Sequence, residues 1–231
     1  MKRFATIVAA LTVIVLGAQA PAVGSVPQGD QSVLDRLLAP ADVPRALGAP
    51  SAEPTDSDQR PVARAAIDLC QRQAGGQVED LGIPRSSGFE AMVVTDKPGD
   101  SLYREVDEVV AVYGSRAAAT RAWRDLRAKA RLCSGQVVVT NAADPPDGST
   151  ITDRYASGVS DGGNAVWLST HSRWSTSDPI SNAAVTTVYT VYRQSADAVI
   201  ATWYYVNGRA RTTLAEQRAT RELAAELAAR W

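Results

Sequence analysis

Two side-chain pairs have the residue types and spacing that hydrolytic chemistry requires. Residues 158–162, GVSDG, match the G-x-S-x-G pattern of a serine nucleophile, and His171, the only histidine of the chain, is the candidate base. That serine works only on a sharp turn from a strand into a helix, where backbone N–H groups stabilise an oxyanion. Because a strand-like run follows Ser160 within a few residues, we interpret GVSDG as a polar hairpin turn.

Glu105 and Asp107 are the second pair, a candidate general acid and base. They alternate along the segment YREVDEVV and would therefore share one face of a strand. Acidic residues that alternate with valines are also typical of a half-exposed strand, and we favour that interpretation. The acidic turns at residues 144–147 and around Asp161 lack the regular oxygen ligands of a calcium loop, so we predict no metal site.

The chain has two cysteines, Cys70 and Cys133, for which three roles compete: a catalytic thiol, a metal ligand or a disulfide. A catalytic thiol needs a nearby histidine, and a zinc site needs more cysteine and histidine ligands than this chain has. An even cysteine count in a secreted protein favours pairing. We therefore predict a Cys70–Cys133 disulfide.

Secretion is indicated by the N-terminus, where we assign a signal peptide to residues 1–24. A basic start precedes an apolar run, and small residues offer two cleavage points, after Ala20 and after Gly24. Pro21 disfavours the first, so we place cleavage after Gly24. The apolar run is too short for a comfortable membrane span, and no cysteine lies nearby to carry the lipid of a bacterial lipoprotein. We expect a secreted, extracellular protein that is soluble after cleavage.

Composition excludes some classes of partner. Removal of the signal leaves 22 basic and 25 acidic residues, a net charge of −3, which favours neither nucleic acid nor an anionic membrane surface. Arginine outnumbers lysine 21 to 3, which we interpret as the signature of a high-GC genome and a hint of actinobacteria. The length suits a single domain.

The remaining pattern divides into an N-terminal segment and one domain. Residues 25–61 contain two predicted short helices within 31–48, followed by a polar connector over 49–61. Residues 62–231 form the predicted domain. From Gly88, alternating β-branched and aromatic residues indicate two strands, GFEAMVVT and YREVDEVVAVYG.

A helix is predicted from its cap at Ser115 to about Leu132. Its apolar side chains recur at steps of three and four and define one buried face, made of Ala119, Trp123, Leu126, Ala130 and Cys133. Cys133 therefore continues the buried stripe. The arginines on the rest of the helix are interpreted as a solvated face rather than a site for an acidic polymer or lipid.

About five strands and a final helix follow. The segments AVTTVYTVYR and DAVIATWYYV predict a hairpin, and Asn207-Gly208 ends its second strand. Thr213 and Glu216 form a predicted capping box at the start of a C-terminal amphipathic helix. The order of elements predicts an α+β fold with a mostly antiparallel sheet, helices packed on it, and a possible cleft.

The layout resembles the PknH-like extracellular sensor domain family of actinobacteria. The resemblance is carried by DEVVAVYGSRAAATRAWRDLRAKARLCSGQVVV, with Trp123, Cys133 and Gly135 at corresponding places, and by the late hairpin. In that family the helix-terminal cysteine pairs with an earlier one. Members commonly carry a second cysteine pair, which this chain lacks. The resemblance implies a ligand-sensing or binding domain, and it does not imply an enzyme.

Aromatic residues of the late strands are the best candidates for a binding site. Tyr189 and Tyr192 fall on opposite faces of one strand, so the hairpin is apolar or aromatic on both sides. A face that no helix covers would form a groove, whereas full cover would make these side chains core residues. The predicted ligand-binding residues are His171, Arg173, Trp174, Tyr189, Tyr192 and Trp203.

We predict a non-enzymatic, monomeric, sensor-like protein that binds an extracellular small molecule or a cell-envelope component in a cleft beside the sheet, without a cofactor. The first alternative is a protein-docking module of the cell envelope, which would show a large exposed apolar patch. The second is a secreted hydrolase that uses Ser160 with His171, or Glu105 with Asp107.

Overall fold

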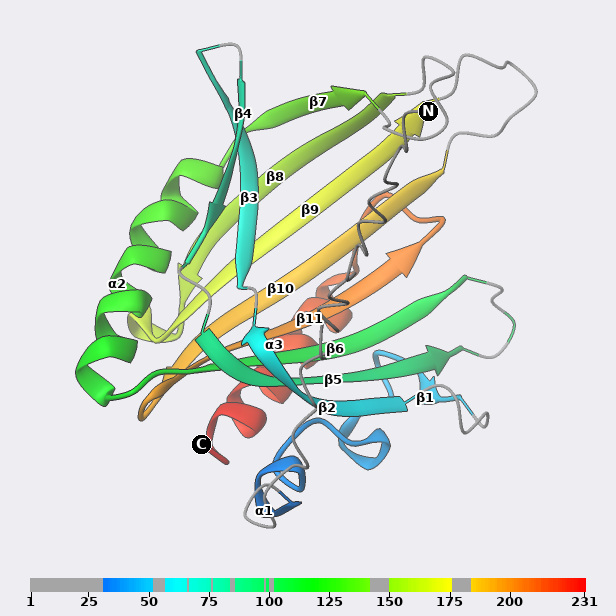
Figure 1. Ribbon diagram of the computed structural model, residues 1–231. Coiled ribbons are helices and arrows are strands. Elements are labelled where there is room, and N and C mark those ends of the chain that lie inside the picture. The colour runs from blue at the N-terminus through cyan, green and yellow to red at the C-terminus, as the bar shows by residue number, and fades with distance from the viewer. Residues whose placement is uncertain are drawn as a thin grey trace, which may run out of the picture.

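A computed structural model describes residues 31–51, 57–65, 67–75, 77–83, 86–97, 99, 102–141, 150–175 and 184–231. The predicted signal peptide and its cleavage points lie outside these residues. A nine-stranded antiparallel sheet forms the centre, in the order β1-β5-β6-β11-β10-β9-β8-β7, with β2 also paired to β5 (Figure 1). Its strands are β1 Ala49–Pro50, β2 Ser57–Ala65, β5 Ser86–Asp96, β6 Arg104–Val112, β7 Val137–Asn141, β8 Thr150–Ser160, β9 Ala165–Ser175, β10 Val185–Ser195 and β11 Ala198–Asn207.

Helix α2 (Arg116–Cys133) and a separate hairpin, β3 (Asp68–Ala74) with β4 (Gln77–Gly82), cover one face of the sheet, which we call the α2 face (Figure 1). The Ser115 side chain accepts a hydrogen bond from the Ala118 N–H and caps the helix as predicted. Every residue of the predicted stripe is buried, and Ala122 joins it. The sequence reasoning did not predict the β3–β4 hairpin, although a Gly-Gly dipeptide in the sequence is a hairpin signal.

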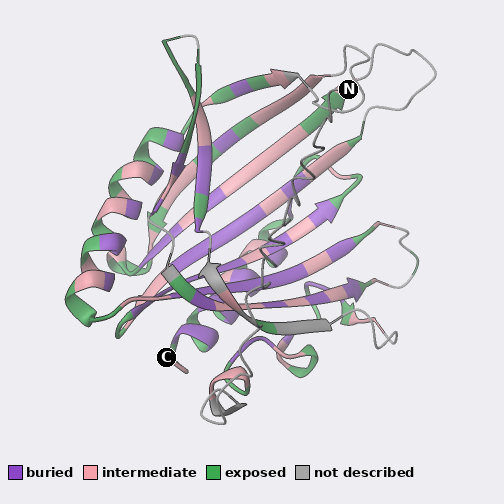
Figure 2. Ribbon diagram, in the orientation of Figure 1, coloured by how far each residue is buried: buried purple, intermediate pink, exposed green. Residues whose placement is uncertain are grey.

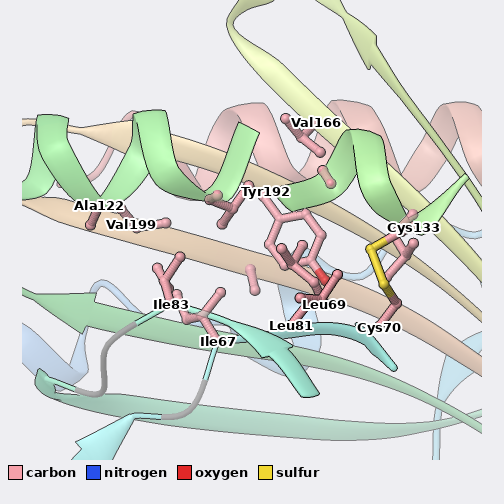
Figure 3. Packing of buried hydrophobic residues seen from close by; sticks show 14 of the residues in the cluster. Ile67, Leu69, Cys70, Leu81, Ile83, Ala122, Cys133, Val166, Tyr192 and Val199 are labelled. Atoms are coloured by element: carbon pink, nitrogen blue, oxygen red, sulfur yellow. A yellow bond between two sulfur atoms is a disulfide. The ribbon is translucent and has the colours of Figure 1, made fainter. Parts of the chain in front are cut away.

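The predicted disulfide is confirmed, because Cys70 of β3 and Cys133 at the end of α2 are bonded, with their Cα atoms 5.8 Å apart. Both lie in a core cluster in which Ile67, Leu69 and Leu81 pack against Ala122 and other α2 side chains (Figure 3). The bond therefore joins the helix to the hairpin across a buried apolar layer.

Helix α3 (Leu214–Ala228) covers part of the opposite face, which we call the α3 face (Figure 1). Thr213 and Glu216 form the predicted capping box at its start. Near its end, Leu223 and Leu227 pack with Leu37 and Leu38 of the N-terminal segment on this face of the sheet. The N-terminal segment is therefore part of the domain core.

Two local expectations were wrong in the N-terminal segment. Only a four-residue helix, α1 (Gln31–Leu34), and a 3₁₀ turn, Pro40–Asp42, form where two helices were predicted. Residues 57–65 form strand β2 rather than a connector, because they pair with β5 along the sheet edge. The side chains of Asp42 and Arg230 form an ion pair of 2.7 Å that attaches the turn to the C-terminus.

Cover of the α3 face is uneven. Helix α3 packs against β10 and β11, whose residues are largely buried. Strands β8 and β9 are mainly half-buried or exposed along most of their length, as Figure 2 shows. Part of the sheet beside α3 is therefore open on the α3 face.

The predicted fold class is confirmed, because the structure is an antiparallel sheet with helices packed on it. Within the described ranges, no helix combines the length and apolar character needed to span a membrane.

Candidate functional site

The six predicted binding residues lie on both faces of the sheet and do not converge on one site. Strand alternation and the pairing register place His171, Arg173 and Tyr189 on the α3 face. The other three point to the α2 face: Trp174, Tyr192 and Trp203. Arg173 and Trp174 are exposed near the end of β9.

Tyr192 is a core residue. Only 2% of it is exposed, and its hydroxyl donates a hydrogen bond of 2.8 Å to the Asp68 carbonyl oxygen. Burial raises the pKa of this hydroxyl, so it stays a donor. Its position supports a structural role, because the hydrogen bond attaches β10 to the start of the β3–β4 hairpin.

Trp203 lines a groove of about 360 Å³ on the α2 face, together with Glu90, Met92, Glu105 and Asp107. Its indole N–H donates to the Asp107 carboxylate. Burial raises the pKa of Asp107 well above its ordinary value, and the neighbouring Glu105 carboxylate raises it further. The Glu105 carboxylate accepts a hydrogen bond of 2.7 Å from the Tyr103 hydroxyl. Both acidic side chains are therefore engaged by protein donors, whereas the carboxyl pair of a glycosidase must flank a substrate bond.

Ser160 and His171 do not meet. In the β8–β9 register Ser160 lies opposite Ala165, whereas His171 lies opposite Arg154, six positions away. At roughly 3.3 Å per residue this separation is about 20 Å, far beyond hydrogen-bond reach. A short 3₁₀ turn and then strand β9 follow Ser160, so the structure has no nucleophile elbow here.

A cavity of about 520 Å³ lies on the open part of the α3 face and brings His171 and Tyr189 together. We call it the α3-face cavity. Strands β8, β9 and β10 form its floor, and the segment before α3 and the first turns of that helix form its wall. Its lining residues are Arg154, Tyr155, Ala156, Trp167, Ser169, His171, Tyr189, Ala210, Arg211, Thr212, Gln217 and Arg221. The volume suits a small molecule.

The indole of Trp167 forms the main apolar surface of this cavity, and the buried ring of Tyr189, which is 2% exposed, lies against it. Trp167 and Tyr189 stack at a centroid distance of 6.2 Å and an interplanar angle of 21°. Gly158 of β8 lies directly opposite Trp167, and a Cβ atom there would approach the indole to 2.7 Å. The absence of a side chain at Gly158 therefore lets the indole lie against the sheet.

Gly158→Ala is expected to displace Trp167 towards the cavity and to destabilise the protein by about 1–3 kcal/mol through overpacking. Denaturant unfolding measures the loss, and tryptophan fluorescence reports the displacement. Gly114→Ala is the matched control, since open space surrounds that position. Equal stability of the two variants would contradict the proposed fit of Trp167 over Gly158.

The formally charged side chains that line the cavity are all arginines. Arg154 lies directly opposite His171 in the sheet, Arg211 precedes α3, and Arg221 projects from that helix. The Arg221 guanidinium donates a hydrogen bond of 3.5 Å to the Tyr189 hydroxyl, whose pKa burial raises above its ordinary value. The His171 Nδ1 atom is shielded from solvent and has no described hydrogen-bond partner.

Sequence reasoning missed Trp167, Arg154, Arg211 and Arg221. Trp167 could have been found, because it lies four residues before His171 and so shares its strand face. The arginines carry no local signal, since tertiary packing alone brings β8, the segment before α3 and the helix together. In the described ranges, no group of His, Cys, Asp or Glu side chains could hold a metal ion.

Comparison with known proteins identifies a family. A sequence model described as the PknH-like extracellular domain matches residues 30–230. The crystal structure of the extracellular domain of PknH from Mycobacterium tuberculosis is similar with a TM-score of 0.47 and 14% identity, over 87% of this chain and 96% of that one. No curated protein matches.

Proposed function

The chain belongs to the family of PknH-like extracellular domains, and from that membership we propose that it is a secreted sensor-type domain that binds a small extracellular molecule without chemical conversion. The ligand occupies the α3-face cavity. The observation that carries this proposal is the convergence of His171 and Tyr189 with Trp167 in a cavity of about 520 Å³.

A binding role is favoured over hydrolysis by the geometry of both candidate catalytic pairs. Ser160 and His171 lie about 20 Å apart along the strands, from six positions at roughly 3.3 Å each. Glu105 accepts a hydrogen bond from the Tyr103 hydroxyl, and Asp107 accepts one from the Trp203 indole. The first pair is too far apart to act on one substrate bond, and both acidic groups of the second pair are engaged by protein donors.

The docking alternative rests on exposed apolar side chains at the sheet edge. Val137 and Val139 of β7 are 44% and 49% exposed, and Leu132 at the end of α2 is 45% exposed. Alternation with the buried Val138 places Val137 and Val139 on the α3 face, whereas Leu132 belongs to the helix on the other face. These side chains therefore do not form the large continuous apolar surface that marks a docking site. The cavity therefore remains the better-supported site.

Native mass spectrometry of the protein, purified from the culture medium of its natural host, tests the proposal. We expect a bound small molecule on the wild-type protein and none on Ser169→Trp, because the new indole fills the cavity. Ser172→Trp, which places the same side chain on the α2 face of β9, should retain the ligand. An empty wild-type protein, or a ligand that Ser169→Trp retains, would overturn the proposal.

A further inference from the structure

We propose that the α3-face cavity selects a small organic anion that carries at least two negative charges beside a planar or apolar group. This inference rests on the proposed function and names the chemical class of its ligand. It is argued from the charge, the arrangement and the shape of the cavity.

The lining of the cavity contains three arginines and no carboxylate. Some arginines elsewhere meet acidic partners, as in the pairs Arg72–Glu79, Arg193–Asp161, Arg209–Glu216 and Arg230–Asp42. Arg154, Arg211 and Arg221 form no such ion pair with any residue that the structure describes. Exposed arginines of α2, such as Arg121 and Arg131, also lack such a pair among the described residues, but they lie on one solvated helix face. In the cavity, three guanidinium groups line one space, in a chain whose acidic residues slightly outnumber its basic ones.

The three guanidinium groups reach the cavity from different elements. Arg154 comes from β8, Arg211 from the segment before α3, and Arg221 from the helix itself. A guanidinium group offers a planar fork of N–H donors that matches the oxygens of a phosphate or carboxylate group. Convergence from three directions suits a ligand with several anionic oxygens better than a single carboxylate.

Neutral groups complete the recognition of an anion. The Tyr189 hydroxyl stays protonated, because burial raises its pKa, and it already accepts a hydrogen bond from Arg221. Its proton is therefore free to be donated to a ligand oxygen. The His171 side chain also lines the cavity and adds a further polar group to its wall.

The aromatic wall determines the rest of the ligand. Trp167 presents a partly exposed indole surface beside the arginines, and its ring stacks on Tyr189, which is itself only 2% exposed. A bare inorganic anion leaves this surface in contact with water, whereas a planar or apolar group covers it. The cavity therefore favours an anion with an organic part over inorganic phosphate.

Isothermal titration calorimetry with four probes tests this selectivity. 1-Naphthyl phosphate is planar and dianionic, 1-naphthol planar and neutral, 1-naphthylmethylamine planar and cationic, and inorganic phosphate dianionic without an apolar group. We expect 1-naphthyl phosphate to bind at least about tenfold more tightly than each of the others. High salt should weaken its binding, because part of the affinity is electrostatic.

Arginine variants assign the binding to the cavity. Arg154→Gln, Arg211→Gln and Arg221→Gln should each weaken the binding of 1-naphthyl phosphate about tenfold and leave that of 1-naphthol unchanged. Arg124→Gln, an exposed change on α2 at the other face, is the matched control and should bind like the wild type. Thermal unfolding confirms that each variant is folded.

The possible results separate the two proposals. The anion inference would be overturned by any of three results. 1-Naphthol or the amine binds as tightly as 1-naphthyl phosphate or more tightly, or none of the four probes binds. The third result is that the cavity arginine variants bind 1-naphthyl phosphate like Arg124→Gln. If 1-naphthol binds best and Ser169→Trp abolishes its binding, the anion inference fails and the cavity remains the binding site. If 1-naphthyl phosphate binds equally to Ser169→Trp, its site lies elsewhere and both proposals fail for this cavity.

Discussion

Replacement of both cysteines by alanine is expected to lower the free energy of unfolding by about 4 kcal/mol, the largest effect of any crosslink or contact considered. Cys70 and Cys133 are 63 residues apart in the sequence. A crosslink over such a loop restricts the unfolded chain, and its removal restores that conformational entropy. Both side chains are also buried between α2 and β3, so the variant loses packing in the same cluster.

Urea unfolding followed by tryptophan fluorescence measures this loss. The single variant Cys70→Ala should lose about as much stability as the double variant, because either change removes the bond. Dithiothreitol should destabilise the wild-type protein and leave the double variant unaffected. A loss below about 1 kcal/mol would show that packing alone holds α2 on the β3–β4 hairpin.

Glu216→Gln is expected to cost about 3 kcal/mol at neutral pH. The Glu216 side chain is 1% exposed and forms ion pairs with Lys97 and Arg209. It also accepts hydrogen bonds from the Thr213 N–H and the Tyr204 hydroxyl. A glutamine keeps the shape but leaves the two cations without a counter-charge in a buried setting.

This loss should depend on pH in a defined direction. Burial alone raises the pKa of Glu216, but the bonds from Lys97 and from the Thr213 backbone outweigh it and hold the value at about 2. Because the folded pKa is depressed from its ordinary 4.5, the stabilisation is fully present above that value and is lost as the pH falls towards 2. The stability difference between wild type and variant should therefore shrink over this window.

Acid titration of the unfolding midpoint in both proteins checks the prediction. Glu222→Gln, an exposed change on the same helix, is the matched control and should alter stability by less than about 0.5 kcal/mol at any pH. A constant difference between Glu216→Gln and wild type from neutral pH to pH 2 would contradict the ion-pair origin of the effect.

Local features of the fold were predictable because a few neighbouring residues encode each of them. The Ser115 cap and the Thr213–Glu216 capping box formed as predicted, since a side chain and the backbone two or three positions away suffice. The Cys70–Cys133 bond followed from the cysteine count and the secretory signal rather than from position. The late hairpin followed from its alternating residues and its Asn207-Gly208 end.

The candidate site was only partly predictable. Alternation along β9 and β10 identified His171 and Tyr189, and the same alternation assigned Tyr192 to the opposite face. It could not reveal that Tyr192 is buried beneath the β3–β4 hairpin, because that hairpin reaches it from more than a hundred residues away. Sequence patterns describe which residues share a face, and they do not describe what covers it.

The amino-acid sequence by itself therefore determined the helix caps, the strand faces and the disulfide, which depend on short-range patterns and on the cellular compartment. Tertiary structure alone decided which part of the α3 face remains open. Helix α3 packs on β10 and β11 and leaves β8 and β9 uncovered on that face. The same packing brought Arg154, Arg211 and Arg221 to one cavity. These arginines are close to one another because of long-range packing, which no local residue pattern reveals.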